Sequence, residues 1–524
     1  MKLLRNILTI FNKNEKVKAF KSIDVQNDNK LCINIIDIFN NKNGIKANFS
    51  DDIFDITEEL IINDSKIEYT RRFLNNGDIL VFLEVDTKQK IIIELNDSVN
   101  LDYSDFENMY KIPPFDNRYG ENKVTGPSLY GHNSNLNIIV SKVYHYRKLQ
   151  HKYDDGENSE LYELKAETNN IEKLDKGINI AIDNVSEKAS LFFMISKEKL
   201  FLNKDSMDNY FKFYYKSIEN NFVANSYFIQ KSGTYTKLPY SIEPFTKDGY
   251  GYSLHHSSKK ELIDFLIKDN ERYFYNMLTN AIVQAFMYQK HENGVFYTSY
   301  TSTWLKKDTG IKAPYIDTRL NETFNLMIKD YKKIIDNKNI IDNTINYMNY
   351  IINYEKNGGE IYISKRGKFY PDYFKYGLKG KTHTSLNHQL GIANSMLEIY
   401  YQTNENKYLD SFLDIMYFLE DTCDSWIKSN GDLFYGLRIQ DRKDYFYGDD
   451  YVYVTLIDLL ISQKNWKNIN GDFNIFLNKL INSKLSYLDS NEYGIFNDNS
   501  KYASGEPIQS KNQAVRLYKE IFEY

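Results

Sequence analysis

The second half of the chain repeats one pattern at a period of roughly 65 residues, a length that fits a helical hairpin with its turn. Four segments there end in a turn followed by a short aromatic stretch: "ENGVFYTS" at Gly294, "GGEIYIS" at Gly359, "NGDLFYGL" at Gly431 and "EYGIFND" at Gly494. A polar loop follows each segment, and then a new apolar helix begins. Repeated units of this kind stack on their neighbours and bury a common core.

The two helices of each predicted hairpin differ in character. The stretch "SLNHQLGIANSMLEIYY" is apolar nearly all round, which is typical of an inner helix. The stretch "YLDSFLDIMYFLEDTCDSW" keeps its apolar residues on one stripe, so it is predicted to be an outer helix that faces water. Inner helices are predicted to begin near Ser253, Asp317, His383, Asp449 and Gln509. This alternation predicts an incomplete (α/α) toroid with about four and a half hairpins.

The first half of the chain has the alternating pattern of β-strands. Short strands extend from Val17 to about Val99, and more strands follow a loop-like region rich in proline and glycine. The sequence therefore predicts an α+β multidomain chain, in which an N-terminal β-rich, sandwich-like region precedes an incomplete (α/α) toroid of helical hairpins. The expected limits are residues 1–102 for an N-terminal β domain, 103–248 for a second β-rich region and 249–524 for the toroid as the catalytic domain.

Composition excludes several function classes. The chain has 66 basic and 71 acidic residues without a long block of one sign, so nucleic acid is not expected as a partner. Two cysteines are too few for a disulfide framework or a thiolate zinc site. The chain lacks a phosphate-binding glycine loop and a nucleophile elbow. It also lacks a paired-cysteine metal motif and the cysteine and histidine set of a zinc-dependent toroidal cyclase, so no metal and no cofactor are expected.

The start of the chain bears on location. Its basic residues and brief apolar run are interrupted before a signal-peptide core forms, and no run reaches the length of a membrane span. A cytoplasmic location is expected, with this N-terminal segment as the candidate for peripheral contact with a membrane.

The first turns of the inner helices carry the candidate site. Inner helices of a toroid run in the same direction, so their first turns are expected to converge on one concave end. The polar residues expected there are Asp317, Arg319, Glu322, His383, Asn387, His388, Asp449 and Asp450. Ordinary helix capping is the alternative for the aspartates. Arg319, Glu322 and His388 are less easily explained in that way, because long or titratable side chains in a buried turn need a partner.

The preceding loops add aromatic and cationic side chains. These are Trp304, Tyr370, Tyr373, Tyr435, Arg438 and Tyr445. Aromatic rings stack on sugar faces and guanidinium groups hold carboxylates, which favours an acidic sugar as the ligand. The alternative is that the aromatic residues of these turns only pack against the helical hairpins, and we favour this structural role for Phe296, Phe434 and Phe496.

The helix start "KTHTSLNHQL", the stretch "YYQTNENKYL" and the tyrosine- and arginine-rich loops resemble the glucuronyl C5-epimerase family. The resemblance covers mostly Gly249–Tyr524, and the same architecture is similar to toroidal polysaccharide lyases and glycoside hydrolases. It implies removal of the proton next to a uronate carboxylate and its return from the opposite face. The roles that it implies are proton transfer by Tyr370, Tyr373, Tyr435 or Tyr445, with Glu322 as a charged partner and Arg319 or Arg438 on the carboxylate.

His383 is expected to face the cleft as a further catalytic residue, while His388, one turn further in, supports it. The remaining expected substrate contacts are Trp304, Asp317, Asn387, Asp449 and Asp450.

Two other classes stay open. A hydrolase would pair Asp317 or Glu322 with Asp449 or Asp450 across the scissile bond, and a lyase would use the same toroid. A non-catalytic glycan-binding or assembly protein would use the same loops only to bind. A homodimer is also left open.

Overall fold

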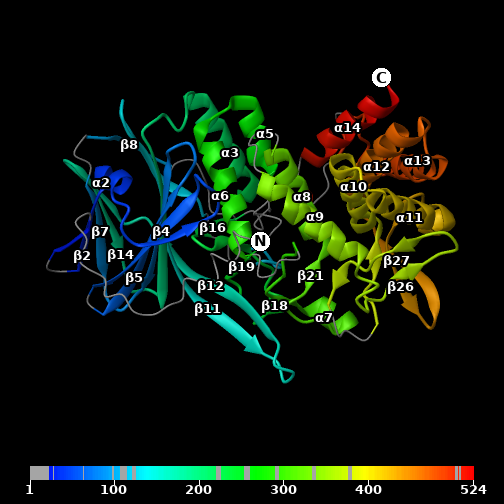
Figure 1. The fold of residues 1–524 in the computed structure, drawn as a ribbon, viewed down its shortest axis with the longest axis horizontal. Coiled ribbons are helices and arrows are strands. Elements are labelled where there is room, and N and C mark those ends of the chain that lie inside the picture. The colour runs from blue at the N-terminus through cyan, green and yellow to red at the C-terminus, as the bar shows by residue number, and fades with distance from the viewer. Residues whose placement is uncertain are drawn as a thin grey trace. The chain divides into compact units, whose positions relative to one another are not determined.

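The computed structural model describes residues 23–26, 29–62, 64–96, 100–106, 115–120, 125–219, 226–252, 260–288, 294–332, 338–375, 380–497, 499–501, 506 and 509–523. Its contacts divide the chain into two compact units (Figure 1). The first, called here the β-rich unit, comprises Met1–Tyr288 with Ser299–Thr303. The second, the helical unit, comprises Gln289–Thr298 with Trp304–Tyr524.

Two large sheets form the β-rich unit. The five-stranded sheet has the order β1 (Ile23–Gln26), β2 (Lys30–Asn34), β7 (Ile91–Asn96), β14 (Gly177–Ile182) and β13 (Ile171–Leu174). The main path of the 13-stranded sheet is β16 (Tyr227–Gln230), β17 (Gly233–Lys237), β19 (Gly249–Tyr252), β12 (Asn158–Thr168), β11 (Val143–Lys152), β15 (Lys188–Ser196), β6 (Ile79–Asp86), β5 (Ser65–Phe73), β4 (Phe54–Ile62) and β3 (Ile45–Asn48). Off this path, β10 (Asn137–Ser141) pairs with β15, β9 (Pro127–His132) pairs with β10, and β8 (Asp102–Asp105) pairs with β9.

The alternating pattern of the strands explains how the sheets bury their apolar sides. Ile79, Val81, Leu83 and Val85 of β6 join one hydrophobic cluster with apolar residues of β2, β7 and β14, which belong to the other sheet. Strands from both sides of residue 102 pair directly, since β15 pairs with β6 and β14 with β7. The limit expected at that residue therefore does not coincide with a boundary between sheets.

The helices of the β-rich unit are α2 (Ile35–Asn40), α3 (Lys204–Glu219), α5 (Lys260–Asp269) and α6 (Arg272–Tyr288). The toroid was expected to begin at residue 249, but α6 clusters with the strands. Gln284 explains this placement: its Nε2 donates to the Gln230 carbonyl at 2.5 Å, and its Oε1 accepts from Thr234 of β17 at 3.1 Å. The helix start expected near Ser253 lies outside the described residues.

Paired helices make up most of the helical unit. They are α7 (Thr303–Thr309), α8 (Thr318–Lys332), α9 (Lys338–Ile352), α10 (Leu386–Thr403), α11 (Asn406–Thr422) with the short η3 (Cys423–Trp426), α12 (Val454–Asn470), α13 (Ile475–Ser490) and α14 (Gln509–Phe522). Short strands connect them: β21 (Ile316–Asp317) pairs with β24 (Tyr373–Phe374), β22 (Tyr362–Ile363) with β23 (Lys368–Phe369), and β25 (Thr384–Ser385) with the hairpin of β26 (Phe434–Gln440) and β27 (Lys443–Asp449). In the β-rich unit, β18 (Ile242–Glu243) pairs with β20 (Thr301–Ser302).

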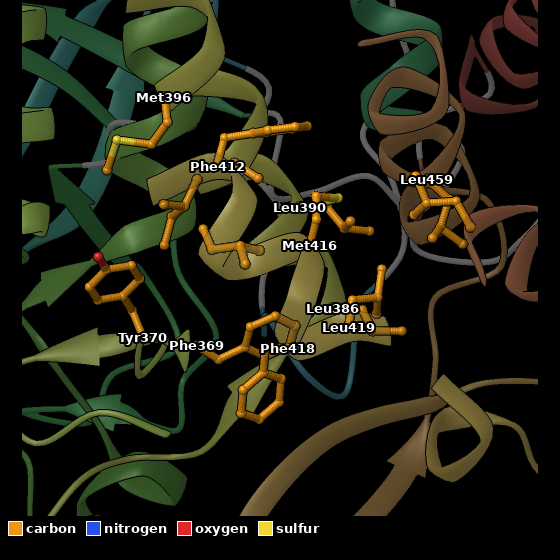
Figure 2. Packing of buried hydrophobic residues seen from close by; sticks show 14 of the residues in the cluster. Phe369, Tyr370, Leu386, Leu390, Met396, Phe412, Met416, Phe418, Leu419 and Leu459 are labelled. Carbon is orange, nitrogen blue, oxygen red and sulfur yellow. The ribbon is translucent and has the colours of Figure 1, made fainter. Parts of the chain in front are cut away.

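The predicted difference between inner and outer helices is present in this unit. Helix α10 packs against α8, α11 and α12, and its side chains are buried continuously from Leu386 to Leu397. Helix α11 buries one face, from which Phe412, Met416 and Leu419 meet the α10 side chains (Figure 2). Three consecutive hairpins, α8–α9, α10–α11 and α12–α13, follow this scheme and α14 packs on α12. None of the helices among the described residues is long and apolar enough to cross a membrane.

Candidate active site in the helical unit

Arg319 connects the N-terminal parts of three helices. It lies on α8, and its Nη1 donates to Oε2 of Glu322 at 2.9 Å and to the carbonyl of Asn387 on α10 at 3.0 Å. Its Nη2 lies 2.9 Å from Oδ2 of Asp458 on α12. The N-terminal parts of α8, α10 and α12 therefore meet at this guanidinium, which two carboxyl groups already face.

A glycine on α10 makes room for this ion pair. A Cβ atom built on Gly391 would lie 2.0 Å from Oε2 of Glu322 and 2.6 Å from Nη1 of Arg319. The Glu322 side chain is buried, and burial raises its pKa to about 7 although Arg319 opposes the shift. Burial therefore favours the protonated form of this carboxyl group, whereas the Arg319 cation favours the ionised form.

Asp317 is a second carboxyl group with a raised pKa. Its Oδ1 accepts the backbone N–H of Leu320 at 3.0 Å, so it caps α8 as the alternative interpretation proposed. Burial raises its pKa to about 7, and the charge of Asp372 acts in the same direction. Asp317 can thus cap α8 and can also take up or release a proton.

Asp372 lies between two histidine rings. It is fully buried; Oδ1 accepts the backbone N–H of Ser385 at 2.9 Å, and Oδ2 accepts the Ser385 hydroxyl at 2.6 Å. Nε2 of His383 is 3.3 Å from Oδ2, and Nε2 of His388 is 3.7 Å from it. Burial lowers the pKa of His388 to about 4, so this ring is neutral at physiological pH.

Four aromatic rings surround His383. The distances from its ring centroid are 5.8 Å to Trp304, 5.6 Å to Tyr373, 5.8 Å to Tyr435 and 6.1 Å to Tyr447. Trp304 is 46% exposed, whereas His383 is 5% exposed. Trp304 therefore meets solvent, whereas the imidazole beside it is buried.

The hairpin β26–β27 adds a cation to these rings. The Arg438 guanidinium lies 4.9 Å from the Tyr447 ring and 5.3 Å from the Tyr445 ring, whose planes are nearly parallel. Nε of Arg438 is buried without a hydrogen-bond partner. Burial raises the pKa of Tyr447 to about 12 and also raises that of Tyr435, so both hydroxyls keep their protons at neutral pH.

The structure brings most of the predicted site residues together. Arg319, Glu322, Asp317 and Asn387 lie at the meeting of α8 and α10, and His383, Tyr373, Tyr435, Tyr445, Arg438 and Trp304 lie in or beside the aromatic group. Asn387 is buried, and its Oδ1 has no hydrogen-bond partner.

Three predicted residues lie elsewhere. Tyr370 is buried in the hydrophobic cluster of α10 and α11 (Figure 2). The side chain of Asp449 is 92% exposed and pairs with Lys428. Asp450 accepts from Lys484 at 2.9 Å and from Thr455 at 2.6 Å, an arrangement that holds the turn before α12.

Sequence reasoning missed two carboxylates, Asp372 and Asp458. An aspartate within the apolar stretch "VTLIDLL" was a detectable signal for Asp458, because a buried charge needs a partner. Asp372 stands in a loop, "YPDYF", where nothing in the local pattern marks it. Over the ranges that the structure describes, no three His, Cys, Asp or Glu side chains are arranged to hold a metal ion.

No protein-family model and no curated protein matches this chain. A family 76 glycoside hydrolase from a bovine Bacteroides thetaiotaomicron strain is similar over 76% of this chain and 87% of its own, at 10% identity and a TM-score of 0.43. A cellobiose 2-epimerase from Bacillus thermoamylovorans is similar over 61% and 82%, at 11% identity and a TM-score of 0.42. A D-mannose isomerase is similar over 60% and 80%, at 12% identity and a TM-score of 0.40. At these TM-scores the likeness assigns no activity to this chain.

Proposed function

We propose that the helical unit is the catalytic part of a carbohydrate-active enzyme that acts on an acidic glycan by C5-epimerisation of a uronate. The observation that carries the proposal is the series Arg438, Tyr447 and His383. The guanidinium lies 4.9 Å from the Tyr447 ring, and that ring lies 6.1 Å from the His383 ring. A cation for a carboxylate and groups for proton transfer therefore lie within reach of a single sugar.

The carboxyl groups near each arginine distinguish the two candidates for binding the substrate carboxylate. Arg319 already faces the carboxyl groups of Glu322 and Asp458. A substrate carboxylate would have to compete there with two carboxyl groups that already accept hydrogen bonds from the guanidinium. Arg438 pairs with no carboxyl group among the residues that the structure describes, and it donates a hydrogen bond to Oε1 of Gln440 at 3.3 Å. We therefore assign the substrate carboxylate to Arg438.

Two protein groups transfer the protons in the proposed reaction. An imidazole nitrogen of His383 takes the proton from the carbon next to the carboxylate, and the electron pair moves into that carboxylate, where Arg438 stabilises the added charge. The Tyr435 hydroxyl gives its proton to the same carbon from the opposite face. Before the next turnover His383 releases its proton to water and Tyr435 regains one. Tyr370 has no role in this scheme because it lies in the core.

A glycoside hydrolase is the second candidate, and one observation favours it. Asp317 and Glu322 have pKa values raised to about 7, as a general acid requires. Asp372 and Asp458, rather than the expected Asp449 and Asp450, are the carboxylates beside them. Hydrolysis would cleave the chain, which separates it from epimerisation.

The test is incubation of the full chain with uronate-containing glycans in heavy water, followed by NMR at the carbon next to the carboxylate. Deuterium uptake in an intact glycan is the result expected of an epimerase. Cleavage without uptake would support the hydrolase, and an unsaturated product a lyase. Binding without any turnover would contradict the catalytic proposal and support a binding protein.

Variants connect the reaction to these residues. Arg438→Gln is expected to reduce uptake by roughly 100-fold or more, because the charge formed on the carboxylate loses its cation. Arg442→Gln, on the turn of the same hairpin, is the matched control and should retain uptake. Tyr435→Phe removes the proposed acid, and Tyr401→Phe, at an exposed ring, is its control.

A further inference from the structure

The hydrogen bonds of Asp372 distinguish its two oxygens. Oδ1 receives the backbone N–H of Ser385, which can only donate. Oδ2 receives the Ser385 hydroxyl and lies 3.3 Å from Nε2 of His383. This is a charge contact without hydrogen-bond geometry, and Nε2 is buried with no hydrogen-bond partner among the described residues. Because the negative charge of this carboxylate lies next to Nε2, it favours the neutral His383 ring with its proton on Nε2.

His388 does not compete for this carboxylate. Its Nδ1 is 2.7 Å from Oγ1 of Thr318, and the Thr318 hydroxyl donates to the backbone carbonyl of Asp372 at 2.9 Å. The remaining lone pairs of Oγ1 therefore accept from Nδ1 of His388, which places the single proton of that neutral ring on Nδ1. Its Nε2 is also the more distant nitrogen, at 3.7 Å from Oδ2.

We infer that Asp372 is a positioning residue that holds the proton of His383 on Nε2 and makes Nδ1 the basic nitrogen of the site. The inference rests on the proposed function, in which His383 removes a proton from the substrate. When Nδ1 takes that proton, the ring becomes an imidazolium whose Nε2–H still faces Asp372. The carboxylate thus stabilises the charge that proton removal creates.

Replacing Asp372 with asparagine tests this role without a change of size. The backbone N–H of Ser385 still needs an acceptor, so the amide oxygen takes the place of Oδ1. The amide nitrogen then takes the place of Oδ2, and it donates toward Nε2 of His383. His383 is therefore expected to move its proton to Nδ1, where it blocks the basic nitrogen.

The experiment is long-range nitrogen NMR of the full chain labelled in histidine, with His383 assigned from a His383→Gln variant. His383 should carry its proton on Nε2 in the unmodified protein and on Nδ1 in Asp372→Asn. Deuterium uptake by the glycan should fall by roughly 100-fold or more in Asp372→Asn. Asp414→Asn, at a partly exposed aspartate that pairs with Lys368, is the matched control and should change neither result.

Two outcomes would overturn the inference: a proton on Nδ1 of His383 in the unmodified protein, or the same tautomer in both proteins. If Asp372→Asn does not fold, the unmodified protein still tests the inference, because a proton on Nδ1 of His383 there overturns it without any variant. The tautomer measurement needs no substrate. Expected tautomers together with no turnover of any glycan would therefore refute the proposed function and leave the Asp372–His383 arrangement intact.

Discussion

Gly391→Ala is the substitution whose effect follows most directly from the geometry. The added Cβ would lie 2.0 Å from Oε2 and 2.4 Å from Cδ of Glu322, and 2.6 Å from Nη1 of Arg319. Carbon and oxygen atoms do not approach so closely, so the Glu322 side chain must move. Its movement disturbs Arg319, a cation that lies on α8 and contacts both α10 and α12.

The expected magnitude combines two opposed effects. Alanine stabilises a helix interior by about 1 kcal/mol relative to glycine. Overpacking of a filled site costs about 1–3 kcal/mol, and displacement of one partner of a buried ion pair adds a share of the about 3–5 kcal/mol that removal of a partner costs. We expect Gly391→Ala to lower the free energy of unfolding by about 2 kcal/mol. For a unit of this size that lowers Tm by roughly 4–8 °C.

Thermal and urea unfolding of the full chain measure the effect. Ser395→Ala is the matched control, because it places alanine one turn further along α10 at a buried hydroxyl without a hydrogen-bond partner, and it should be near neutral. In a Glu322→Ala background the cost of Gly391→Ala should shrink, since the closest clash is gone. An unchanged or higher Tm for Gly391→Ala in the native background would refute the reasoning.

The remaining predictions concern buried charge. Lys484→Met removes a fully buried ammonium group that donates to Asp432 at 2.6 Å and to Asp450 at 2.9 Å, so it should destabilise the protein by about 3–5 kcal/mol in urea unfolding; a loss below about 1 kcal/mol would contradict this. For Glu322 the pKa is raised from 4.5 to about 7, so the folded chain keeps a proton that the unfolded chain releases. Its stabilising contribution is full below pH 4.5 and is lost as pH rises through about 7. Glu322→Gln should therefore flatten the fall of Tm between these pH values, whereas Glu405→Gln, at an exposed position, should leave the slope unchanged.

Some residues of the candidate site could be predicted from the sequence, and others could not. Arg319, Glu322 and His388 were identified because charged or titratable side chains on a buried helix need partners, and each has one in the structure. Tyr370 is a tyrosine in a predicted loop, as the candidates Tyr373 and Tyr435 are, but its ring packs in the hydrophobic core. A one-dimensional pattern does not distinguish these cases, since the direction of a loop side chain depends on which elements pack around it.

By itself the sequence determined the repeat, the alternation of strands in the first half, and the inner and outer character of α10 and α11. These properties depend on the spacing of apolar residues along the chain, which is a local quantity. Tertiary structure alone decided that Asp372 lies between His383 and His388, that Asp458 meets Arg319, and that α6 packs with the strands. These contacts join residues distant in sequence, and the burial that brings them together also raises or lowers the pKa values on which the proposed chemistry depends.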